Sequence, residues 1–286
     1  MPNDSLSKAV LITGCSSGIG RATAEHLAGR GWTVYASARR PESIADLERA
    51  GCKLLALDVN DEDSMVAAVR RVEEAEGAIG VLVNNAGYSQ SGPVEEIPLD
   101  DVRRQFETNV FGLVRLCQLA LPGMRRQGWG KIVNVSSMGG KLVFPGGGFY
   151  HGTKYAVEAI SDALRWEVRG FGVDVVIIEP GLIKTEFGNV AAGSVDAAPA
   201  EGPYGDFTAA VAKATKEAYE GGLPAKLGGG PETVARKIEK AITKRRPKPR
   251  YSVTASAKLA IAQRRILTDR MWDGVLRSQF PQPGGR

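Results

Sequence analysis

Histidine and cysteine are scarce in this sequence of 286 residues. The two histidines, His26 and His151, leave little material for a histidine-rich metal site or a Ser-His-Asp hydrolase. The three cysteines at positions 15, 52 and 117 are odd in number, lie far apart and form no Cys-x-x-Cys pair. The sequence therefore predicts neither a disulfide framework nor a metal centre.

Long apolar runs are also missing. No stretch approaches the roughly 20 apolar residues that a membrane-spanning helix needs. The start of the chain lacks the basic segment and long apolar core of a secretory signal. With 43% hydrophobic residues the chain still has ample material for a core. We expect a cytoplasmic protein in which residues 1–286 form one domain.

The net charge of +5 is unevenly distributed. Between Arg236 and Arg270, twelve Lys and Arg residues face two acidic residues, so this stretch carries +10 and the remainder about −5. A local excess of this kind is not the signature of a nucleic-acid-binding surface, so we expect no nucleic-acid partner. The basic C-terminal extension 250–286 is compatible with a solvated face, packing on a partner subunit or, least favoured, contact with a membrane surface.

Strand-like and helix-like segments alternate along the first two thirds of the chain. Apolar runs separated by amphipathic segments of ten or more residues are typical of a parallel sheet covered on both faces. The predicted fold class is therefore α/β, a Rossmann-type doubly wound parallel sheet of about seven strands. Strands are expected at 9–13, 32–37, 52–59, 79–87, 130–137, 173–181 and 249–254. Helices are expected at 19–31, 41–51, 61–77, 99–124, 150–169, 207–222 and 231–246, with helical periodicity in the tail.

The pattern loosens after the last of the strands in this alternating part. Residues 191–206 are rich in Ala, Gly and Pro, which is typical of a loop. We interpret 186–230 as a substrate lid region within the same domain.

Three glycines, Gly14, Gly18 and Gly20, stand between the first strand and the first helix. In a doubly wound sheet this is where helix N–H groups and the helix dipole bind a dinucleotide pyrophosphate, and glycine allows the backbone to approach closely. The spacing G-x-x-x-G-x-G differs from the usual G-x-G-x-x-G, and such a turn alone is a weak indicator. The other cofactor contacts predicted in this turn are Ser16, Ser17 and Ile19.

The end of the second strand bears on the choice between NAD and NADP. An acidic residue there binds the ribose hydroxyls of NAD, but Ala38 occupies this place and Arg39 and Arg40 follow. A guanidinium pairs with a 2′-phosphate in a bidentate manner, whereas an acid repels it. We therefore predict NADP(H), with Arg39 as the first contact and Arg40 as the second. A solvated pair of arginines is the alternative.

A tyrosine and a lysine lie four residues apart at the start of the helix predicted at 150–169. Residues at i and i+4 are neighbours on a helix, with Cβ atoms roughly 5–6 Å apart. An ammonium near Tyr150 would favour the phenolate and lower the phenol pKa from its ordinary value of about 10. Tyr150 and Lys154 could then act as an acid–base pair, in which Tyr150 gives up a proton and takes it back. Alone, the pair also fits an ordinary solvent-facing helix turn.

Together, the glycine turn, the sequence NNAG at 84–87 and the Tyr150/Lys154 pair resemble the short-chain dehydrogenase/reductase family. The resemblance runs from about residue 7 to residue 190 and more loosely to the tail. It implies reversible hydride transfer between a nicotinamide cofactor and a carbonyl group. It also implies a homodimer or homotetramer assembled through helices at 100–124 and 150–169.

The resemblance assigns roles to individual residues. It selects Ser137 over Ser136 because the family serine lies thirteen residues before the tyrosine, and Ser137 would stabilise the developing alkoxide. Lys154 would bind the nicotinamide ribose. Asn109 would hold a water that links the lysine to solvent, a role that can coexist with relaxing a helix kink. The further cofactor contacts that it implies are Asp58, Val59, Asn85, Ala86, Gly87, Pro180, Gly181, Ile183 and Thr185. A helix cap for Asp58 and simple turn chemistry for Asn85 and Gly87 are the alternatives.

The candidate walls of the substrate pocket are mostly apolar, which favours a small hydrophobic ketone, aldehyde or alcohol over a sugar or phosphate ester. They are Ser137, Met138, Val143, Phe144, Phe149, Tyr150, Leu182 and Phe187. The segment TVYASARRPE, the long lid and the basic end are similar to the 17β-hydroxysteroid/retinol branch of the family.

Two neighbours of the pair receive structural interpretations. His151 points about 100° away from Tyr150 around the helix, so we predict it at the surface or an interface. Tyr155 is predicted to pack on the cofactor or a partner subunit. A non-catalytic NADP-binding redox sensor on the same fold is the alternative function, but such proteins typically lose the tyrosine or the lysine.

Overall fold

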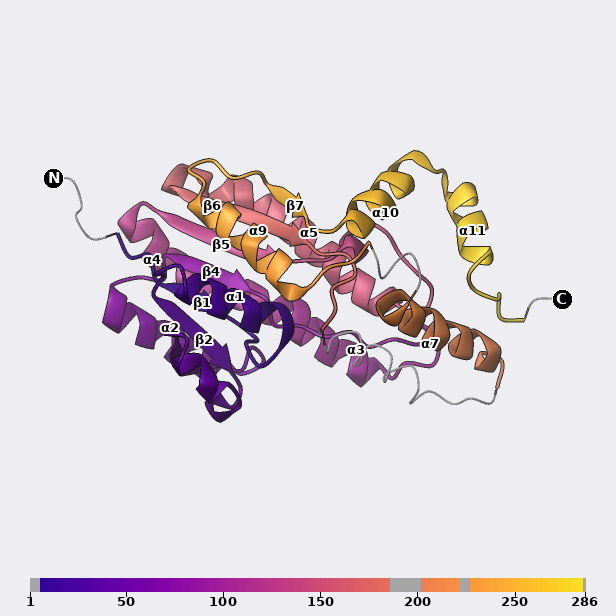
Figure 1. Cartoon of the computed structure of the whole chain (residues 1–286), viewed down its shortest axis with the longest axis horizontal. Coiled ribbons are helices and arrows are strands. Elements are labelled where there is room, and N and C mark those ends of the chain that lie inside the picture. Colours follow the sequence, from indigo (N-terminus) through magenta and orange to yellow (C-terminus); the bar gives the residue numbers. More distant parts are fainter. Residues whose placement is uncertain (1–5, 186–201, 222–226, 285–286) are drawn as a thin grey trace.

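Within the residues that the structure describes, 6–185, 202–221 and 227–284, seven strands form one parallel sheet. In this computed structural model the spatial order is β3-β2-β1-β4-β5-β6-β7 (Figure 1). The order reverses between β1 and β4, and ligands of such sheets bind at the carboxyl ends of the strands beside that point. The predicted Rossmann-type sheet is confirmed. The strands are β1 (Val10–Ile12), β2 (Val34–Ala38), β3 (Lys53–Ala56), β4 (Val81–Asn84), β5 (Gly130–Val135), β6 (Val173–Glu179) and β7 (Arg250–Ser252).

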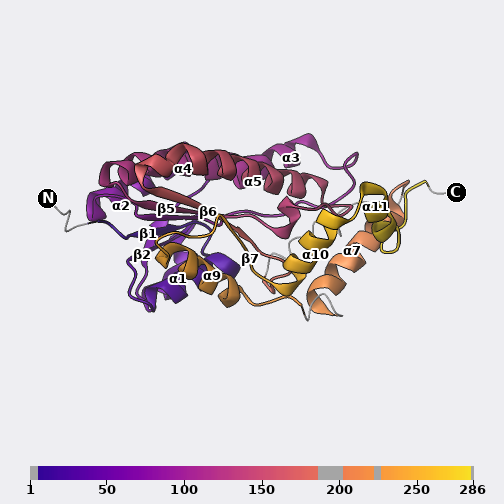
Figure 2. The ribbon, with the colours of Figure 1, turned by 90° about the horizontal axis from the view of Figure 1, so that it is seen from above.

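Helices cover both faces of the sheet (Figure 2). Because successive side chains of a strand point to opposite faces, Val10 and Ile12 join the core on the side of α1 and α9, whereas Leu11 joins the core on the side of α2, α4 and α5. These helices are α1 (Gly18–Ala28), α2 (Glu62–Glu76), α4 (Gly112–Gln127), α5 (Gly148–Val168) and α9 (Pro231–Thr243).

Helix α2 illustrates how the local sequence sets an element's ends. The Asp61 side chain caps its first turn by accepting a hydrogen bond from the Ser64 N–H at 3.2 Å. Glu62 and Asp63 complement the positive end of the helix dipole. Gly77, with φ of 83°, ends the helix in a conformation that glycine adopts without strain.

The helix predicted at 41–51 is instead a 3₁₀ segment, η1 (Pro41–Glu48). Its buried side chains, Ile44 and Leu47, are three residues apart, which matches the three residues per turn of a 3₁₀ helix. The backbone leaves helical geometry at Ile44, where φ is −127°. The break at Ile44 divides the segment into short pieces, in which 3₁₀ geometry is common.

The helix predicted at 99–124 consists of α3 (Leu99–Phe106), a π-helical segment η2 (Glu107–Phe111) and α4. The π segment contains Asn109, which is 1% exposed. Short π-helical segments occur frequently at functional sites. The kink that the sequence analysis considered for Asn109 is thus a change of helix type.

Beyond the carboxyl ends of the strands lie α7 (Gly205–Glu220), α10 (Ala255–Ile266) and α11 (Asp269–Arg277) (Figures 1 and 2). The tail divides because α10 ends at Ile266 and Thr268 caps the next helix, accepting a hydrogen bond from the Met271 N–H at 3.4 Å. Trp272 and Ile261 pack on Leu142, so the tail covers the loop after β5. Of the described helices, none is both long and apolar enough to cross a membrane.

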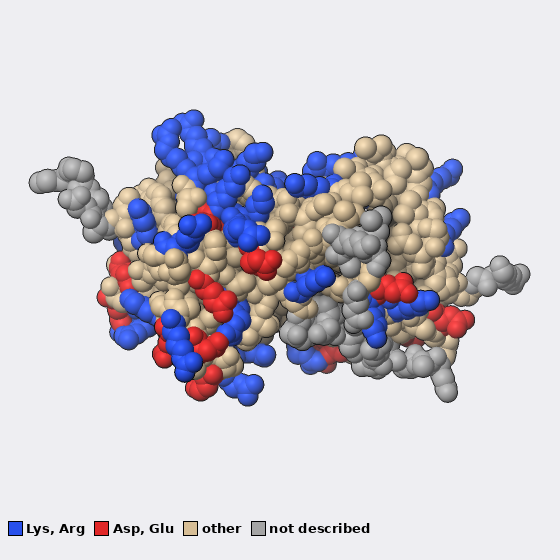
Figure 3. Space-filling model, in the orientation of Figure 1, with Lys and Arg blue, Asp and Glu red and all other residues tan. Residues whose placement is uncertain are grey.

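Figure 3 shows Lys and Arg side chains gathered at one end of the molecule, over the connection between α9 and β7. Lys244, Arg245 and Arg246 of this connection are exposed. The connection leads into β7, so it lies at the amino-terminal edge of the sheet. This part of the basic excess is therefore remote from the carboxyl ends of the strands.

Candidate active site

A cavity of about 1030 Å³ lies at the carboxyl ends of the strands. Its lining comes from the turns after β1 to β6, the first turns of α5, one face of α7 and the residues after α11. Most of the site residues predicted from the sequence meet in this one cavity. A space of this size exceeds what most drug-sized ligands need.

The glycine turn forms one end of the cavity. Gly14, Ser16, Ser17, Gly18 and Ile19 line it. Gly14 and Gly18 have φ of 72° and 58°, a backbone region in which other residues are strained. The Ser17 side chain makes no capping hydrogen bond, so it leaves the first N–H groups of α1 to a ligand.

Gly20, also predicted as a cofactor contact, does not line the cavity. It lies behind the turn, where a Cβ would stand 2.3 Å from the Gly14 carbonyl oxygen and 2.5 Å from the Asn85 amide nitrogen. Gly20 therefore allows the close packing on which the turn depends. The backbone of this turn and the first N–H groups of α1 therefore form a site that fits a pyrophosphate.

At the ends of β2 and β3 the structure separates the two predicted arginines. Both are exposed, but Arg39 lines the cavity and Arg40 does not. Asp58 and Val59 also line the cavity, although β3 ends at Ala56, before the predicted end of the strand. One Asp58 oxygen accepts a hydrogen bond from the Asn60 N–H at 3.0 Å, which stabilises the turn.

The turn after β4 is tied to the glycine turn. The Asn85 amide donates to the Thr13 carbonyl at 2.9 Å and to the Gly14 carbonyl at 3.1 Å. Asn85, Ala86 and Gly87 line the cavity. The Asn85 side chain therefore holds the two turns together as well as facing the cavity.

Tyr150 and Lys154 line the cavity from α5, and Ser137 lines it from the end of β5. Tyr150 and Ser137 share a hydrogen bond through their side chains. The Lys154 amine lies 5.8 Å from the centre of the Tyr150 ring and donates to the Val135 carbonyl at 2.9 Å. The three side chains that the resemblance singled out thus stand together.

The electrostatics of the pair differ from the prediction. Burial raises the pKa of Tyr150 above its ordinary value; the bond to Ser137 opposes this effect and the nearby Tyr219 adds to it. Burial also lowers the pKa of Lys154 to about 8, against the opposing influence of Glu158. The net shift of the Tyr150 pKa is therefore upward, opposite to the predicted lowering, because desolvation is its largest cause.

Both serines at the end of β5 reach the cavity. The Ser137 hydroxyl accepts a hydrogen bond from the Gly139 N–H at 3.0 Å, which fixes its position. The Ser136 hydroxyl is buried and has no partner among the described residues. Ser137 is thus hydrogen-bonded with Tyr150, whereas the Ser136 hydroxyl has no such bond among the described residues.

A family model described as short chain dehydrogenase matches residues 8–193. The chain belongs to the short-chain dehydrogenase family. It is 37% identical over 275 residues to an NADPH-dependent 3-dehydrocapnine reductase of Ornithobacterium rhinotracheale, covering 93% of this chain and 94% of that protein. It is 34% identical over 270 residues to a 3-ketodihydrosphingosine reductase of Bacteroides thetaiotaomicron, covering 94% and 96%.

Solved structures agree with this assignment. The crystal structure of a short-chain dehydrogenase from Streptomyces avermitilis matches with a TM-score of 0.75 and 31% identity, covering 96% of this chain and 99% of that one. The protein is thus a short-chain dehydrogenase, an oxidoreductase of a family that uses a nicotinamide cofactor. Its glycine turn and large cavity fit such a group.

In this short-chain dehydrogenase Asn109 does not line the cavity. Its side chain accepts a hydrogen bond from the Tyr88 N–H at 3.0 Å and donates to the Tyr88 carbonyl at 2.8 Å and to the Thr153 hydroxyl at 3.1 Å. Asn109 therefore fixes the segment after β4 against α5. A Cβ on Gly87 would lie 2.9 Å from the Asn109 oxygen and 3.8 Å from the Lys154 amine, so both groups border the same point.

His151 is buried, so its predicted surface position is wrong. Its Nε2 accepts a hydrogen bond from the Phe144 N–H at 3.2 Å, and its Nδ1 lies 3.0 Å from the Gly139 carbonyl oxygen. A ring that donates from one nitrogen and accepts at the other is neutral, and burial lowers the pKa of His151. The loop after β5 folds back over the start of α5, which the helical periodicity does not reveal.

The predicted substrate walls are only partly found. Met138, Phe144 and Leu182 line the cavity, but Phe149 does not. Val143 is 43% exposed and does not line the cavity, because its loop turns so that its carbonyl accepts a hydrogen bond from the Trp272 indole at 3.4 Å. Phe187 lies outside the described residues, as do 186–201 and 222–226 of the predicted lid.

The residues predicted as cofactor contacts in the turn after β6, which are Pro180, Gly181, Ile183 and Thr185, also line the cavity. Tyr155 is exposed and does not face the cavity, so packing on the cofactor is wrong. No group of three or more metal-ligating side chains was found among the described residues.

Sequence reasoning missed the residues that close the far end of the cavity. Tyr219 lines it from α7, and Gln279 and Phe280 line it from the segment after α11. Burial raises the pKa of Tyr219 to about 12, so its phenol stays neutral. The helical periodicity of 207–222 predicts a helix but not which face meets the cavity, and the tail carries no signal that it returns to the site.

Proposed function

We propose that this protein is an NADP(H)-dependent carbonyl reductase that interconverts a hydrophobic ketone or aldehyde and its alcohol. One observation carries the proposal: Tyr150, Ser137 and Lys154 line the same cavity as the glycine turn. One cavity therefore contains groups suited to proton transfer and groups suited to dinucleotide binding. The retained Tyr150 and Lys154 argue against the alternative of a non-catalytic redox sensor.

The chemistry divides between the cofactor and the side chains. The nicotinamide supplies the hydride when bound, since no amino acid donates one. Ser137, hydrogen-bonded with Tyr150, would hold the carbonyl oxygen beside the phenol and stabilise the charge developing on it. Tyr150 would give its phenolic proton to that oxygen. Lys154 would position the ribose of the cofactor.

The protonation state of Tyr150 favours reduction. Burial raises its pKa, so the phenol keeps its proton at neutral pH. Reduction consumes that proton, whereas oxidation of an alcohol requires the phenolate. At neutral pH the phenol is therefore in the state that proton donation to a carbonyl oxygen requires.

The substrate is assigned by class. Phe144, Val211, Ala218 and Phe280 give the far part of the cavity an apolar lining, with Tyr219 as a polar group. Apolar walls with few polar groups bind hydrophobic ligands. Two relatives are named as reductases of 3-dehydrocapnine and of 3-ketodihydrosphingosine, and the second name specifies a ketone. Both names are compatible with a hydrophobic ketone for this chain.

The proposed cofactor is NADPH. Ala38 leaves no acid at the end of β2, and Arg39 lines the cavity there. A guanidinium suits a 2′-phosphate. The relative from Ornithobacterium rhinotracheale is named as NADPH-dependent.

We also propose a homo-oligomer that packs through α4 and α5. Phe111, the last residue of η2 immediately before α4, is 55% exposed, and Trp166, on α5, is 71% exposed. Large apolar side chains with this much exposure are typical of protein interfaces.

The proposed function is tested by following NADPH oxidation at 340 nm against a panel of hydrophobic ketones and aldehydes. We expect turnover of at least one member, and none of sugars or phosphate esters. Tight NADPH binding without turnover of any carbonyl compound would instead favour the redox sensor.

Phe280→Ala should raise KM for a bulky ketone about tenfold, since it removes apolar contact from the far wall. KM for a small ketone should stay near its natural value, because a short substrate does not reach that wall. Val143→Ala is the matched control, because Val143 lies outside the cavity. Equal effects of Phe280→Ala on small and bulky ketones would contradict this placement.

A further inference from the structure

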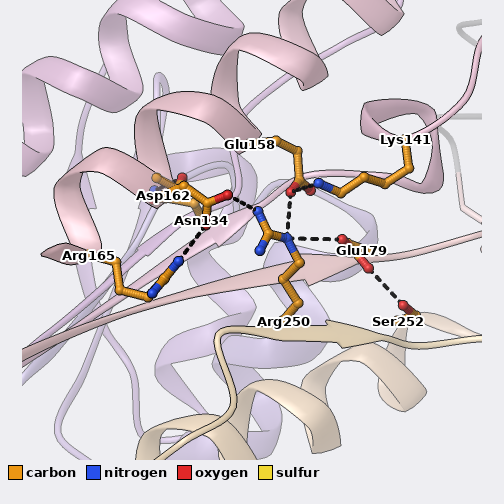
Figure 4. A network of polar contacts seen from close by, with 9 residues as sticks. Asn134, Lys141, Glu158, Asp162, Arg165, Glu179, Arg250 and Ser252 are labelled. Carbon is orange, nitrogen blue, oxygen red and sulfur yellow. Dashed lines mark hydrogen bonds and ion pairs between the residues drawn. The ribbon is translucent and has the colours of Figure 1, made fainter.

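A cluster of charged side chains surrounds Glu158, one helical turn after Lys154 on α5 (Figure 4). The Glu158 side chain is only 5% exposed. One of its oxygens accepts both the Lys141 amine at 2.7 Å and the Arg250 Nε at 2.9 Å. Its other oxygen is buried with no hydrogen-bond partner among the described residues. None of the steps proposed above uses this carboxylate.

Arg250 extends the cluster from α5 to the ends of two strands. Its Nη2 binds an Asp162 oxygen at 2.5 Å, and its Nε lies 3.5 Å from a Glu179 oxygen. The Ser252 hydroxyl donates to the other Glu179 oxygen at 2.7 Å. In Figure 4 the guanidinium stands between the carboxylates of α5 and that of β6.

The segments joined by the cluster are those that carry the candidate catalytic groups. Lys141 immediately follows the 3₁₀ turn η3 (Met138–Gly140), which Ser137 caps. Glu179 immediately precedes Pro180 and Gly181, which line the cavity. Glu158 shares α5 with Tyr150 and Lys154. The buried Glu158 carboxylate therefore connects three segments that carry parts of the candidate site: the loop after Ser137, the turn after β6 and helix α5.

We propose that Glu158 is a positioning residue for Lys154. Its carboxylate fixes the Ser137 loop and β7 on α5 through Lys141 and Arg250. It also lies one helical turn from Lys154, and both side chains are buried, so its negative charge attracts the Lys154 ammonium. The catalytic meaning of this inference rests on the proposed function, whereas the effect of the charge on Lys154 does not.

Desolvation is the reason that Lys154 needs such a neighbour. A buried amine loses its proton readily, and burial brings the pKa of Lys154 down to about 8. Glu158 acts in the opposite direction, while the Lys154 amine itself bonds to the neutral carbonyl of Val135. The other titratable groups facing Glu158 are Lys141, Arg250, Glu179 and Tyr155. The two cations among them stabilise its ionised form.

Glu158→Gln, which removes the charge and keeps the shape, tests the inference on the protein alone. The protein is treated with acetic anhydride at a series of pH values, and mass spectrometry gives the acetylated fraction of Lys154. We expect a midpoint near pH 8 in the natural protein and a midpoint on the order of one pH unit lower in Glu158→Gln. Glu158→Asp keeps the charge and should leave the midpoint in place.

Asp162→Asn is the matched control, because it removes the same charge from the same cluster one turn further from Lys154. An unchanged midpoint in Glu158→Gln, or an equal shift in Asp162→Asn, overturns the proposal. If Glu158→Gln does not fold, Lys141→Met removes a cation from the cluster and should raise the midpoint; no change there also overturns it.

The pH profile of turnover supplies a second readout. With a ketone that the protein reduces, Glu158→Gln should move the alkaline limb of kcat to lower pH, while Glu158→Asp should lower kcat without moving that limb. Failure of the proposed function would appear differently, as absence of turnover in the natural protein with the labelling shift intact.

Discussion

Tyr150→Phe is expected to lower the rate of carbonyl reduction roughly a thousandfold, because it removes the proposed proton donor. The substitution deletes one hydroxyl and keeps the ring in the cavity wall. The Val135 carbonyl holds the Lys154 amine, so the position of that amine should survive. NADPH binding, followed by fluorescence titration, should therefore change little while turnover at 340 nm collapses.

Tyr155→Phe is the matched control for this experiment. Tyr155 is the next tyrosine along α5 but is exposed and does not line the cavity. It should keep the natural rate. A Tyr150→Phe protein that retains most of its activity, or one that loses NADPH binding in proportion to turnover, would contradict the assignment of Tyr150 as proton donor.

The sheet was predictable because its burial leaves a direct trace in the sequence. Strands covered on both faces read as continuous apolar runs, as in β1 and β4, where every residue is buried. The helices between them show one apolar face. Parallel connection then follows, since a strand and a following helix of this length return the chain to the same edge.

Half of the site follows from that topology. In a parallel sheet all carboxyl ends meet at one edge, so residues just after the strands come together whatever their separation in sequence. Gly14, Arg39, Asn85 and Ser137 each follow a different strand and all line the cavity. The sequence could thus place these residues before any contact was known.

The far end of the cavity was not predictable, because tertiary packing alone assembles it. Phe280 packs with Val211 and Phe207 of α7, elements far apart in the chain with no shared sequence period. The position of His151 was predicted wrongly for a similar reason, because the loop after β5 buries its side chain. The pKa of Tyr150 was predicted in the wrong direction because the sequence shows a charged neighbour but not the extent of desolvation.

The preference for NADPH over NADH should depend on Arg39. Affinity for NADPH should exceed that for NADH at least tenfold in the natural protein, since a charge-assisted bond from a guanidinium to phosphate is worth about 1.5–3 kcal/mol. Arg39→Asp should lower NADPH affinity about a hundredfold, because it exchanges attraction of the 2′-phosphate for repulsion. The difference between the affinities for NADPH and NADH should then narrow or reverse, as measured by titration of each cofactor.

Arg40→Asp makes the same change of charge one residue further on and separates contact from general electrostatics. Arg40 does not line the cavity, and its backbone carbonyl is engaged at the start of η1, where it accepts a hydrogen bond from the Ser43 N–H at 3.0 Å. Long-range attraction of the cofactor, screened by solvent, would act similarly from both positions. A direct contact with the 2′-phosphate is expected only from Arg39, which lines the cavity. We therefore expect a clearly smaller loss of NADPH affinity in Arg40→Asp. Equal losses in both variants would mean that the arginine pair acts only through its charge, and equal natural affinities for NADPH and NADH would refute the NADP assignment itself.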